Sequence, residues 1–590
     1  MVTLITEINA MKNLQKYLNA LTEKAFEKIG LDKKYGLLKI SDRPDLADFQ
    51  CNGALAAAKE AKKNPREIAQ AICENLKSDE FQTDIAGPGF INIKVSDTLL
   101  INFLNNFDGT VTHPDTKKET IIDFGGPNVA KPMHVGHLRS SIIGESLKRI
   151  MRYVGDNVTG DIHMGDWGTQ MGMLIYALSQ KFPDLSYFED NNQGPFPKES
   201  PVTLDDLQEI YPLISGQCKE DETIATLCRQ ATYELQQGHP GYRALWQHFV
   251  DVSVADMKKQ FTKLDVDFDQ WFGESRYQKR IAPLLDRLEK ENIAIEDKGA
   301  LIVPVAQESD KAEIPPILLR KSDGGYLYGT TDLATVEERV QDFNANRIVY
   351  VIDSRQFLHC EQVFRAARKS GYTAQFDFVG FGTMNGPDNK PFKTRAGGVM
   401  RLSDLITTLV KEAHNRMEDA GIKNKGIDAQ EIDHIALCVG ISALKFADLQ
   451  HDPTQNYQFD VEKFMRFEGK TGPYLLYAAV RIKSLLRKAN AKESDLKISS
   501  KLNTFERDLA ITLSKFEEYI HRAYDKLSPN ILCDYAFDLA QKFSRFYQEC
   551  PVMKDCDDTT KLSRLKLSAL TLQQLEIISN LLGLQIPNQM

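Results

Sequence analysis

The segment that most constrains the fold joins a short apolar strand to a helix through glycines, prolines and histidines. Residues 119–124 are rich in β-branched and aromatic side chains and predict a buried strand, which the Gly-Gly-Pro run at 125–127 ends. Apolar residues then recur at helical spacing over 138–154. His134 and His137 therefore lie in the first turn of a helix that follows a strand.

The start of this helix has the chemistry of a phosphate site. Its free backbone N–H groups and the positive end of its dipole favour an anion. Gly136, between the two histidines, has no side chain and lets a nucleotide approach the backbone. A histidine pair is also compatible with a structural role or with a metal, but no third ligand stands at a familiar zinc spacing. We predict no metal among the site residues.

Length and composition exclude several classes of protein. The chain has 590 residues, of which 42% are hydrophobic, which is enough for several domains. It contains no run of roughly 18 apolar residues that would span a membrane, and its N-terminus lacks the pattern of a signal peptide. Nine scattered cysteines without a CxxC pair favour a reducing, cytoplasmic setting. A net charge of −9 argues against a uniformly basic nucleic-acid binder, but it allows a local basic face.

The order of predicted elements indicates a multidomain α/β protein. A helix over 11–29 opens a small α+β unit that ends in a strand at 90–94. The near-continuous apolar run at 347–353 is typical of a buried parallel strand. Ligands bind beyond the carboxyl ends of such strands, so the polar residues at 353–359 are expected near a ligand. From about residue 402 onward the pattern is almost entirely helical.

Five motifs together resemble a known family. The sequence His-Val-Gly-His resembles the signature of class I aminoacyl-tRNA synthetases. Its context, and four further motifs in matching order and spacing, resemble arginyl-tRNA synthetases over essentially the whole chain. The motifs are Gly126–Gly144, His163–Gly172, Asp323–Asp332, Ile352–Gln356 and Lys390–Gly398.

The resemblance implies a Rossmann-like parallel-sheet catalytic domain with an N-terminal α+β domain and a C-terminal all-α helical-bundle domain. It also implies approximate boundaries and roles for these parts. They are 1–112 for an N-terminal domain that contacts the tRNA elbow, 113–400 for the catalytic domain with an insertion at about 182–315, 401–460 for a helical connecting region and 461–590 for a helical anticodon-binding domain.

The implied activity is ATP-dependent activation of L-arginine to arginyl-adenylate. Arginine then passes to the 3′-terminal adenosine of tRNA-Arg, with release of AMP and pyrophosphate. The resemblance implies that the first step needs bound tRNA, that Mg²⁺ accompanies ATP, and that the protein is a cytoplasmic monomer without a membrane partner. A carboxylate is ionised at neutral pH, so the chemistry needs positioning and charge stabilisation rather than a general base.

The implied catalytic residues surround the phosphates of ATP. The usual Lys-Met-Ser-Lys motif of the class is replaced by Pro391-Phe-Lys-Thr-Arg395, whose register against the family motif is open. A lysine directly before the histidine motif is thought to compensate in such enzymes, and a plain surface lysine is the alternative. The catalytic set is Lys131, His134, Gly136, His137, Lys393 and Arg395.

The implied arginine site needs acceptors for a planar guanidinium, which a carboxylate holds best. Tyr328 and Asp332 are four residues apart and would share the face of a helix start at the guanidinium. Asn128 and Gln356 would hold the α-amino end, and Asp123 would add negative charge. Without the resemblance, each of these residues is more simply interpreted as structural.

Three places leave the chemistry open. Gly125 stands where serine is common in the family, and Gly329 stands where threonine is common. Either change would alter a hydrogen bond to the substrate carboxylate, but neither removes a charge. The segment 163–167 (His-Met-Gly-Asp-Trp) predicts a tight turn, and it has a packing role at least as readily as a chemical one.

RNA contacts are predicted at both ends of the chain. In the N-terminal domain, Phe49 would stack on a base and Gln50 or Asn52 would read a base edge. The alternative is a helix start capped by Asp48. In the C-terminal domain the candidate aromatic residues, which are equally compatible with a core, are Tyr474, Tyr477, Phe543, Phe546 and Tyr547.

Two other functions compete with the synthetase. A small nucleotidyltransferase with the same histidine motif works without RNA, but its chains are usually far shorter and lack a helical C-terminal domain. A non-catalytic, synthetase-like RNA-binding protein is the second. Loss of Lys131, His134, His137, Asp332 or Gln356 would favour it, and all five are present.

Overall fold

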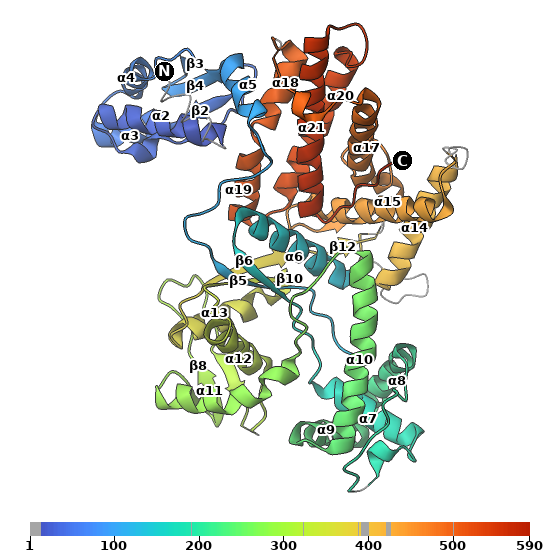
Figure 1. Cartoon of the computed structure of the whole chain (residues 1–590). Coiled ribbons are helices and arrows are strands. Elements are labelled where there is room, and N and C mark those ends of the chain that lie inside the picture. The colour runs from blue at the N-terminus through green and yellow to red at the C-terminus, as the bar shows by residue number, and fades with distance from the viewer. Residues whose placement is uncertain are drawn as a thin grey trace. The chain divides into compact units, whose positions relative to one another are not determined.

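The computed structural model describes residues 13–189, 191–322, 324–386, 389–390, 400–419, 426–499 and 501–590. The chain forms two compact units. Unit 1 holds Met1–Asp115, Arg466–Leu581 and Gln585–Met590, and unit 2 holds Thr116–Met465 and Leu582–Leu584. Figure 1 shows the elements of both.

A parallel four-stranded sheet organises unit 2, in the order β11-β10-β5-β6. Its strands are β5 (Glu119–Asp123), β6 (Asn157–Asp161), β10 (Arg347–Asp353) and β11 (Gln375–Phe381). The chain passes from β5 through α6 (Val135–Val154) to β6, and from β10 through α13 (Phe357–Lys369) to β11. These crossovers leave the β5–β10 boundary in opposite directions, so the switch point at which ligands bind lies beyond the carboxyl ends of β5 and β10.

Helices cover both faces of this sheet (Figure 1). Alternate strand residues such as Ile121, Ile348 and Phe376 share a buried core with α12 (Tyr328–Gln341), α13 and α11 (Gln278–Lys290). On the opposite face lies α6, where the Ser140 hydroxyl donates to the Val351 carbonyl at 2.7 Å. Both faces are buried, as the apolar sequence of β10 predicts.

The rest of unit 2 consists of helices around small sheets. An antiparallel sheet has the order β7-β8-β9, and β12 pairs with β13 in parallel. The elements are α7 (Thr169–Lys181), η2 (Ser186–Phe188), α8 (Leu204–Glu220), α9 (Glu222–Gln237), α10 (Pro240–Lys263), η3 (Glu274–Tyr277), β7 (Ile295–Asp297), β8 (Ala300–Val303), β9 (Ile317–Arg320), η4 (Ser354–Gln356), β12 (Met384–Asn385), α14 (Leu402–Asp419), α15 (Ala429–Leu449), β13 (Tyr457–Gln458) and α16 (Val461–Phe464).

Unit 1 combines an antiparallel sheet, in the order β1-β2-β4-β3, with a bundle of C-terminal helices. Arg507 of the bundle is bonded to Asp48 at 3.0 Å and to Asp97 at 3.1 Å, which joins the two parts. The elements are α2 (Leu14–Lys28), η1 (Lys33–Gly36), β1 (Leu38–Ile40), β2 (Phe49–Cys51), α3 (Gly53–Ala61), α4 (Pro65–Asn75), β3 (Phe81–Ala86), β4 (Phe90–Val95), α5 (Asp97–Asn105), α17 (Gly472–Ala489), η6 (Glu493–Asp495), α18 (Thr504–Leu513), α19 (Phe516–Lys526), α20 (Asn530–Glu549) and α21 (Asp558–Leu581).

The predicted fold class is confirmed. The strand at 347–353 has the predicted bounds, and the strand expected at 119–124 ends one residue earlier. Helix α6 starts at Val135, in line with its first-turn histidines. The division at residues 112, 400 and 460 stays a prediction, because unit 1 pools the two ends of the chain. None of the described helices is both long and apolar enough to span a membrane.

Candidate active site

The two histidines cap the N-terminus of α6. His134 is the N-cap residue, and its Nδ1 accepts the Gly136 N–H at 3.0 Å. The Nδ1 of His137 accepts the His134 N–H at 3.2 Å, which completes a reciprocal capping box. The ring centroids lie 4.0 Å apart. Two histidines thus play the part that serine and glutamate usually take at a helix start.

Burial keeps the two rings neutral, and the hydrogen bonds decide which ring nitrogen carries the proton. Burial, followed by the charges of His134 and Lys131, lowers the pKa of His137 to about 3, and burial also lowers the pKa of His134. Both rings are therefore neutral near pH 7. Each Nδ1 accepts a backbone N–H, so each neutral ring carries its proton on Nε2. The helix start therefore presents two Nε2–H donors as well as its backbone N–H groups.

The close approach of the His134 imidazole requires a glycine at residue 136. A Cβ built at residue 136 would lie 2.7 Å from Cε1 and 2.8 Å from Nδ1 of that imidazole. The backbone here is also exposed, which leaves room for a ligand. The glycine therefore lets the His134 ring fold back over the first turn.

The predicted cations are only partly described by the structure. Lys131 precedes α6, and its ammonium lies 4.6 Å from the ring centroid of Tyr211 on α8. Burial is the largest cause of the lowered pKa values of His134 and His137, and the charge of Lys131 lowers both further. Lys131 therefore belongs to the same cluster of residues. Lys393 and Arg395 lie outside the described residues.

A pocket of about 340 Å³ opens beside the carboxyl end of β10. Three of the five residues predicted to bind arginine line it, namely Tyr328 and Asp332 from α12 and Gln356 from η4. Tyr328 is 69% exposed and stands at the first position of its helix. The structure therefore brings together side chains from two separate motifs at the switch point.

The pocket is also lined by a second carboxylate, that of Glu274, which the sequence analysis did not identify. Glu274 follows β6 by more than a hundred residues and enters the pocket from η3. Burial, followed by the charges of Asp332 and Asp166, raises its pKa to about 7 against the opposing effect of His163. The chain has 82 acidic residues, and Glu274 begins a 3-10 helix of only four residues, so neither spacing nor periodicity distinguishes it.

His359 is the second residue that sequence reasoning did not select individually. It lines the pocket, and its Nε2 lies 2.5 Å from Oδ2 of Asp332. This hydrogen bond raises the pKa of the imidazole. Residue 359 lies within the 353–359 stretch that was expected near a ligand. The imidazole orients the Asp332 carboxylate toward the pocket.

Asp123 does not line the pocket. Its carboxylate is buried and accepts from Arg339 at 2.6 Å, and the same guanidinium donates to Asp161 at 2.7 Å. Burial lowers the pKa of Arg339, but the charges of Asp123, Tyr350 and Asp161 outweigh it and raise that pKa. Among the described residues, Asp123 and Asp161 also form a potential metal-ligand group with His163. Because the guanidinium already occupies both carboxylates, this group does not suit Mg²⁺.

Asn128 stands between β5 and α6 and is not among the residues that line the pocket. It is exposed and lies against Gly165, where an added Cβ would be 2.2 Å from its Oδ1. Gly125, which stands where the family commonly has serine, has φ +87°, and a Cβ there would approach Phe268 to 2.9 Å. At Gly329 a Cβ would approach Ile317 to 2.8 Å. Local packing therefore explains both glycines.

The segment 163–167 positions Glu274 in the pocket. The Asp166 carboxylate accepts the Ser275 N–H at 2.9 Å and its hydroxyl at 2.6 Å. The Met164 carbonyl accepts the Glu274 N–H at 3.0 Å. A Cβ at Gly273 would lie 2.2 Å from the Asp166 carboxylate. The predicted packing role therefore serves the acidic pocket.

The predicted RNA residues of the N-terminal domain are placed differently from one another. Phe49 is 1% exposed in β2, so its ring cannot stack on a base. Gln50 donates to the Asn92 side chain at 3.0 Å. Asn52, rather than Asp48, is the N-cap residue of α3, and its partly exposed side chain makes no cap hydrogen bond.

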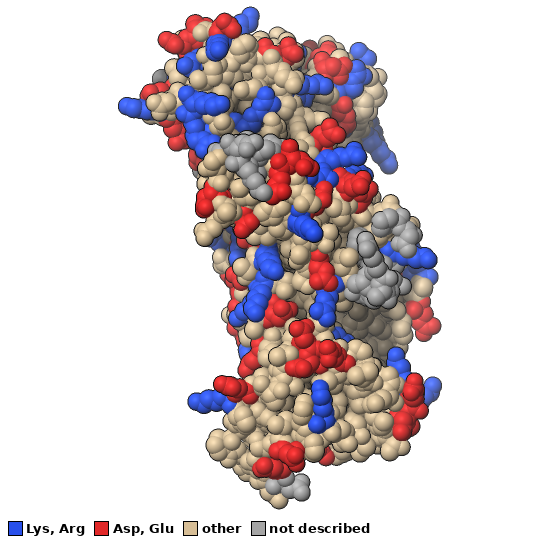
Figure 2. Space-filling view, turned by 90° about the vertical axis from the view of Figure 1, so that its right-hand side faces the viewer, with Lys and Arg blue, Asp and Glu red and all other residues tan. Residues whose placement is uncertain are grey.

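The candidate aromatic residues of the C-terminal domain divide in the same way. Phe543 and Phe546 are core residues, with 1% and 0% exposure, whereas Tyr477 is 47% exposed. Arg481 lies 4.2 Å from the ring centroid of Tyr547. Basic and acidic side chains are interspersed over the face shown in Figure 2. Any RNA contact on this face is therefore local rather than a broad basic surface.

Comparisons with known proteins cover almost the whole chain. Residues 100–461 match the family described as tRNA synthetases class I (R), catalytic domain. Residues 475–590 match the DALR anticodon binding domain, and residues 12–95 match the arginyl tRNA synthetase N terminal domain.

Similar proteins extend over the same length. The arginine–tRNA ligase of Alkaliphilus oremlandii (strain OhILAs) is 48% identical, over 98% of this chain and 100% of that protein. The enzyme of Hyphomonas neptunium (strain ATCC 15444) is 46% identical, again over 98% and 100%. The arginyl-tRNA synthetase of Plasmodium falciparum superimposes with a TM-score of 0.82 and 25% identity, over 98% of this chain and 99% of that one. The Thermus thermophilus structure, at 22% identity, shares the fold with a TM-score of 0.79, over 98% and 100%.

A histidine pair at the start of the helix after β5, beside the switch point of a parallel sheet, and the catalytic-domain match define a class I tRNA synthetase. The three domain matches and the full-length relatives narrow the class further. The chain belongs to the arginyl-tRNA synthetase family.

Proposed function

We propose that the chain joins L-arginine to the 3′-terminal adenosine of tRNA-Arg in two steps. In the first, an oxygen of the arginine carboxylate attacks the α-phosphorus of ATP, and pyrophosphate leaves. In the second, the terminal ribose hydroxyl of the tRNA attacks the activated carbonyl, and AMP leaves. The observation that carries the proposal is an acidic pocket at the same sheet edge as a phosphate-binding helix start.

Asp332 and Glu274 supply the selectivity for arginine. Both carboxylates face one pocket, so a guanidinium entering it can donate to two acceptors. Tyr328 offers a ring and a hydroxyl at its mouth, and Gln356 offers an amide to the α-amino end. The exposed Asn128 is the second candidate for that amino group. Asp123 acts through Arg339, so we propose that it positions β5 rather than binding arginine.

The start of α6 serves the phosphates. The Nε2–H groups of His134 and His137 and the backbone N–H of Gly136 would donate to phosphate oxygens, where negative charge develops in the transition state. Lys131 adds a positive charge beside them. We propose Lys393 and Arg395 as further cations from sequence alone. Mg²⁺ bound to the phosphates of ATP would neutralise part of their charge.

Residues at both ends of the chain would bind tRNA-Arg. We propose the N-terminal domain (1–112) for the tRNA elbow, with Gln50 and Asn52 as candidates, and the C-terminal domain (461–590) for the anticodon. The name of the family matched by residues 475–590 supports the latter role. We further propose that the enzyme is a cytoplasmic monomer that needs bound tRNA for adenylate formation.

The test is ATP–pyrophosphate exchange, with arginine and with lysine, each with and without tRNA-Arg. Exchange with arginine only when tRNA is present supports the whole proposal. Exchange without tRNA keeps the enzyme but removes the coupling, and equal exchange with lysine contradicts the role of the pocket. No exchange under any condition favours a non-catalytic RNA-binding protein.

A further inference from the structure

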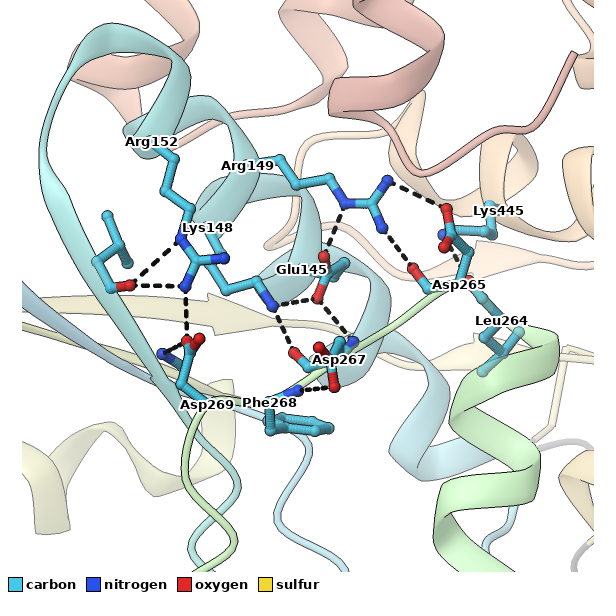
Figure 3. Close-up of polar contacts among 12 residues, drawn as sticks. Glu145, Lys148, Arg149, Arg152, Leu264, Asp265, Asp267, Phe268, Asp269 and Lys445 are labelled. Atoms are coloured by element: carbon cyan, nitrogen blue, oxygen red, sulfur yellow. Dashed lines mark hydrogen bonds and ion pairs between the residues drawn. The ribbon is translucent and has the colours of Figure 1, made fainter.

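A fully buried lysine lies on α15, away from the pocket. Lys445 is 0% exposed, and its ammonium donates to the Leu264 carbonyl at 2.7 Å (Figure 3). The charged groups that face it are Arg149 and Glu145 of α6 and Asp265 of the segment after α10. Burial lowers the pKa of Lys445 to about 7, because none of these charges compensates fully for lost water.

Gly583 closes the space over this ammonium. Residues Leu582–Leu584 group with unit 2, and Leu582 and Leu584 are 1% and 4% exposed. A Cβ at Gly583 would lie 2.2 Å from the Lys445 Nζ. Gly583 also has φ +65°, in the left-handed region that favours glycine. A side chain at this position would have to displace the lysine.

The segment that Lys445 holds, residues 264–274, runs along β6. Its first part is fixed to α6: Arg149 bonds the Asp265 carboxylate at 3.1 Å and its carbonyl at 2.8 Å, and Glu145 accepts the Asp267 N–H at 3.1 Å (Figure 3). Farther along, the Asp269 N–H donates to the Gly160 carbonyl at 3.0 Å.

The same segment ends at the acidic pocket. The Phe272 carbonyl accepts the Met164 N–H at 2.8 Å, and two residues later the Glu274 N–H bonds the Met164 carbonyl at 3.0 Å. A short stretch with repeated hydrogen bonds thus joins Leu264 to a carboxylate that lines the pocket. The histidine end of α6 is separate, because His134 lies 15 residues before Arg149 in the chain, or about 20 Å along the helix.

We infer that Lys445 and Gly583 are positioning residues for arginine: together they fix the start of segment 264–274 and so hold Glu274 in the pocket. The inference rests on the proposed function of that pocket. A methionine, which is one atom shorter, would leave the position of the ammonium empty and bury no charge, but it could not hold the Leu264 carbonyl. The effect of disturbing this pair falls on arginine and largely spares ATP.

The experiment compares Gly583→Ala with Gly371→Ala in the full chain. Gly371 also has positive φ, at +87°, but nothing lies within 4 Å of an added Cβ, so its variant controls for backbone strain alone. The measurements are KM for arginine and for ATP in tRNA-dependent pyrophosphate exchange, with the melting temperature of each variant. We expect Gly583→Ala to raise KM for arginine about two- to thirtyfold, with KM for ATP changed less than twofold.

A double-variant cycle identifies the contact responsible. Lys445→Met alone should also raise KM for arginine, because the bond to Leu264 is lost. Combining it with Gly583→Ala should add little, since the Cβ then meets no ammonium. A variant pair with fully additive effects contradicts the inference, as does Gly583→Ala behaving like Gly371→Ala or affecting both substrates equally. An inactive wild type would instead contradict the proposed function.

Discussion

The two halves of the candidate active site are built in opposite ways. The half proposed to bind phosphate lies within a few residues of chain, and the hydrogen bonds of one helix start set its geometry. The pocket proposed for arginine is assembled from η3, α12, β10, η4 and α13, whose pocket residues run from 274 to 364. The first half is a local motif, whereas the second exists only when distant segments meet. Changes in the two halves should therefore separate arginine binding from the chemical step.

The largest separation is expected from Asp332→Ala. Removing one partner of a desolvated charge pair typically costs about 2–5 kcal/mol, which corresponds to roughly 30- to several-thousand-fold in affinity for arginine. ATP binding should be largely unchanged. Calorimetric titration with each substrate measures both effects, and Asp332→Asn, which keeps the shape, should lose most of the same affinity. Unchanged arginine affinity in either variant would place the guanidinium elsewhere.

His137→Ala should have the converse effect. Loss of an Nε2–H donor at the phosphates should slow adenylate formation about 10²–10³-fold, while arginine binding changes little. Single-turnover pyrophosphate release measures the rate. His137→Asn is the matched control, since its side-chain oxygen can still accept the His134 N–H and keep the helix cap. A normal rate in His137→Asn would show that only the cap matters.

Gly136→Ala tests whether ring placement, rather than helix stability, governs the local half. The added Cβ must displace the His134 ring, at a cost of about 1–3 kcal/mol, so the rate should fall roughly 5- to 100-fold. Alanine has a higher helix propensity than glycine, so a less stable helix would not explain a slower reaction, and the melting temperature of the variant checks this. Gly216→Ala in α8, where nothing lies within 4 Å of the Cβ, is the control. Equal activity of the two variants would contradict the clash.

The smallest effect is a pH dependence confined to the pocket. Glu274 has a raised pKa of about 7, so below that pH it is protonated and one negative charge is lost. A bound guanidinium favours the charged form, so arginine affinity should fall as pH drops through 7, by at most about tenfold per pH unit. Glu274→Gln should bind arginine more weakly and with a flatter profile between pH 6 and 8. Parallel profiles for the two proteins would exclude Glu274 as the titrating group.

The difference between the halves also explains what the sequence could predict. The β10 bounds and the helix after the histidines follow from apolar periodicity and turn residues, which act over a few residues. The shared face of Tyr328 and Asp332 follows from their spacing of four on a helix start, at a place that the family resemblance implied. Glu274 and Asp123 show the limit of such patterns. The first is an acidic residue at the start of the short 3-10 helix η3, and long-range packing brings it into the pocket. The second is a carboxylate on β5 that accepts a hydrogen bond from Arg339, 216 residues away in the chain.

Phe49 and the two family departures show the same limit at single residues. The sequence around Phe49 allowed either a ring that stacks on a base or a helix start capped by Asp48, whereas the packing of β2 buries the ring to 1% exposure. Gly125 is explained by a positive φ and by Phe268, which lies far along the chain. Such contacts depend on where other segments come to lie, so no local pattern carries them.

By itself, the sequence determined the class of fold, the order of most elements and the place of the two histidines at the start of α6, because turn residues and the period of apolar residues act over short stretches of chain. Tertiary structure alone decided which carboxylates face the pocket, which two are bound by Arg339, and why residue 583 is a glycine beside Lys445. The physical reason is the range of the interactions. Burial, charge pairing and steric exclusion act between residues that are close in space, whatever their separation in the chain.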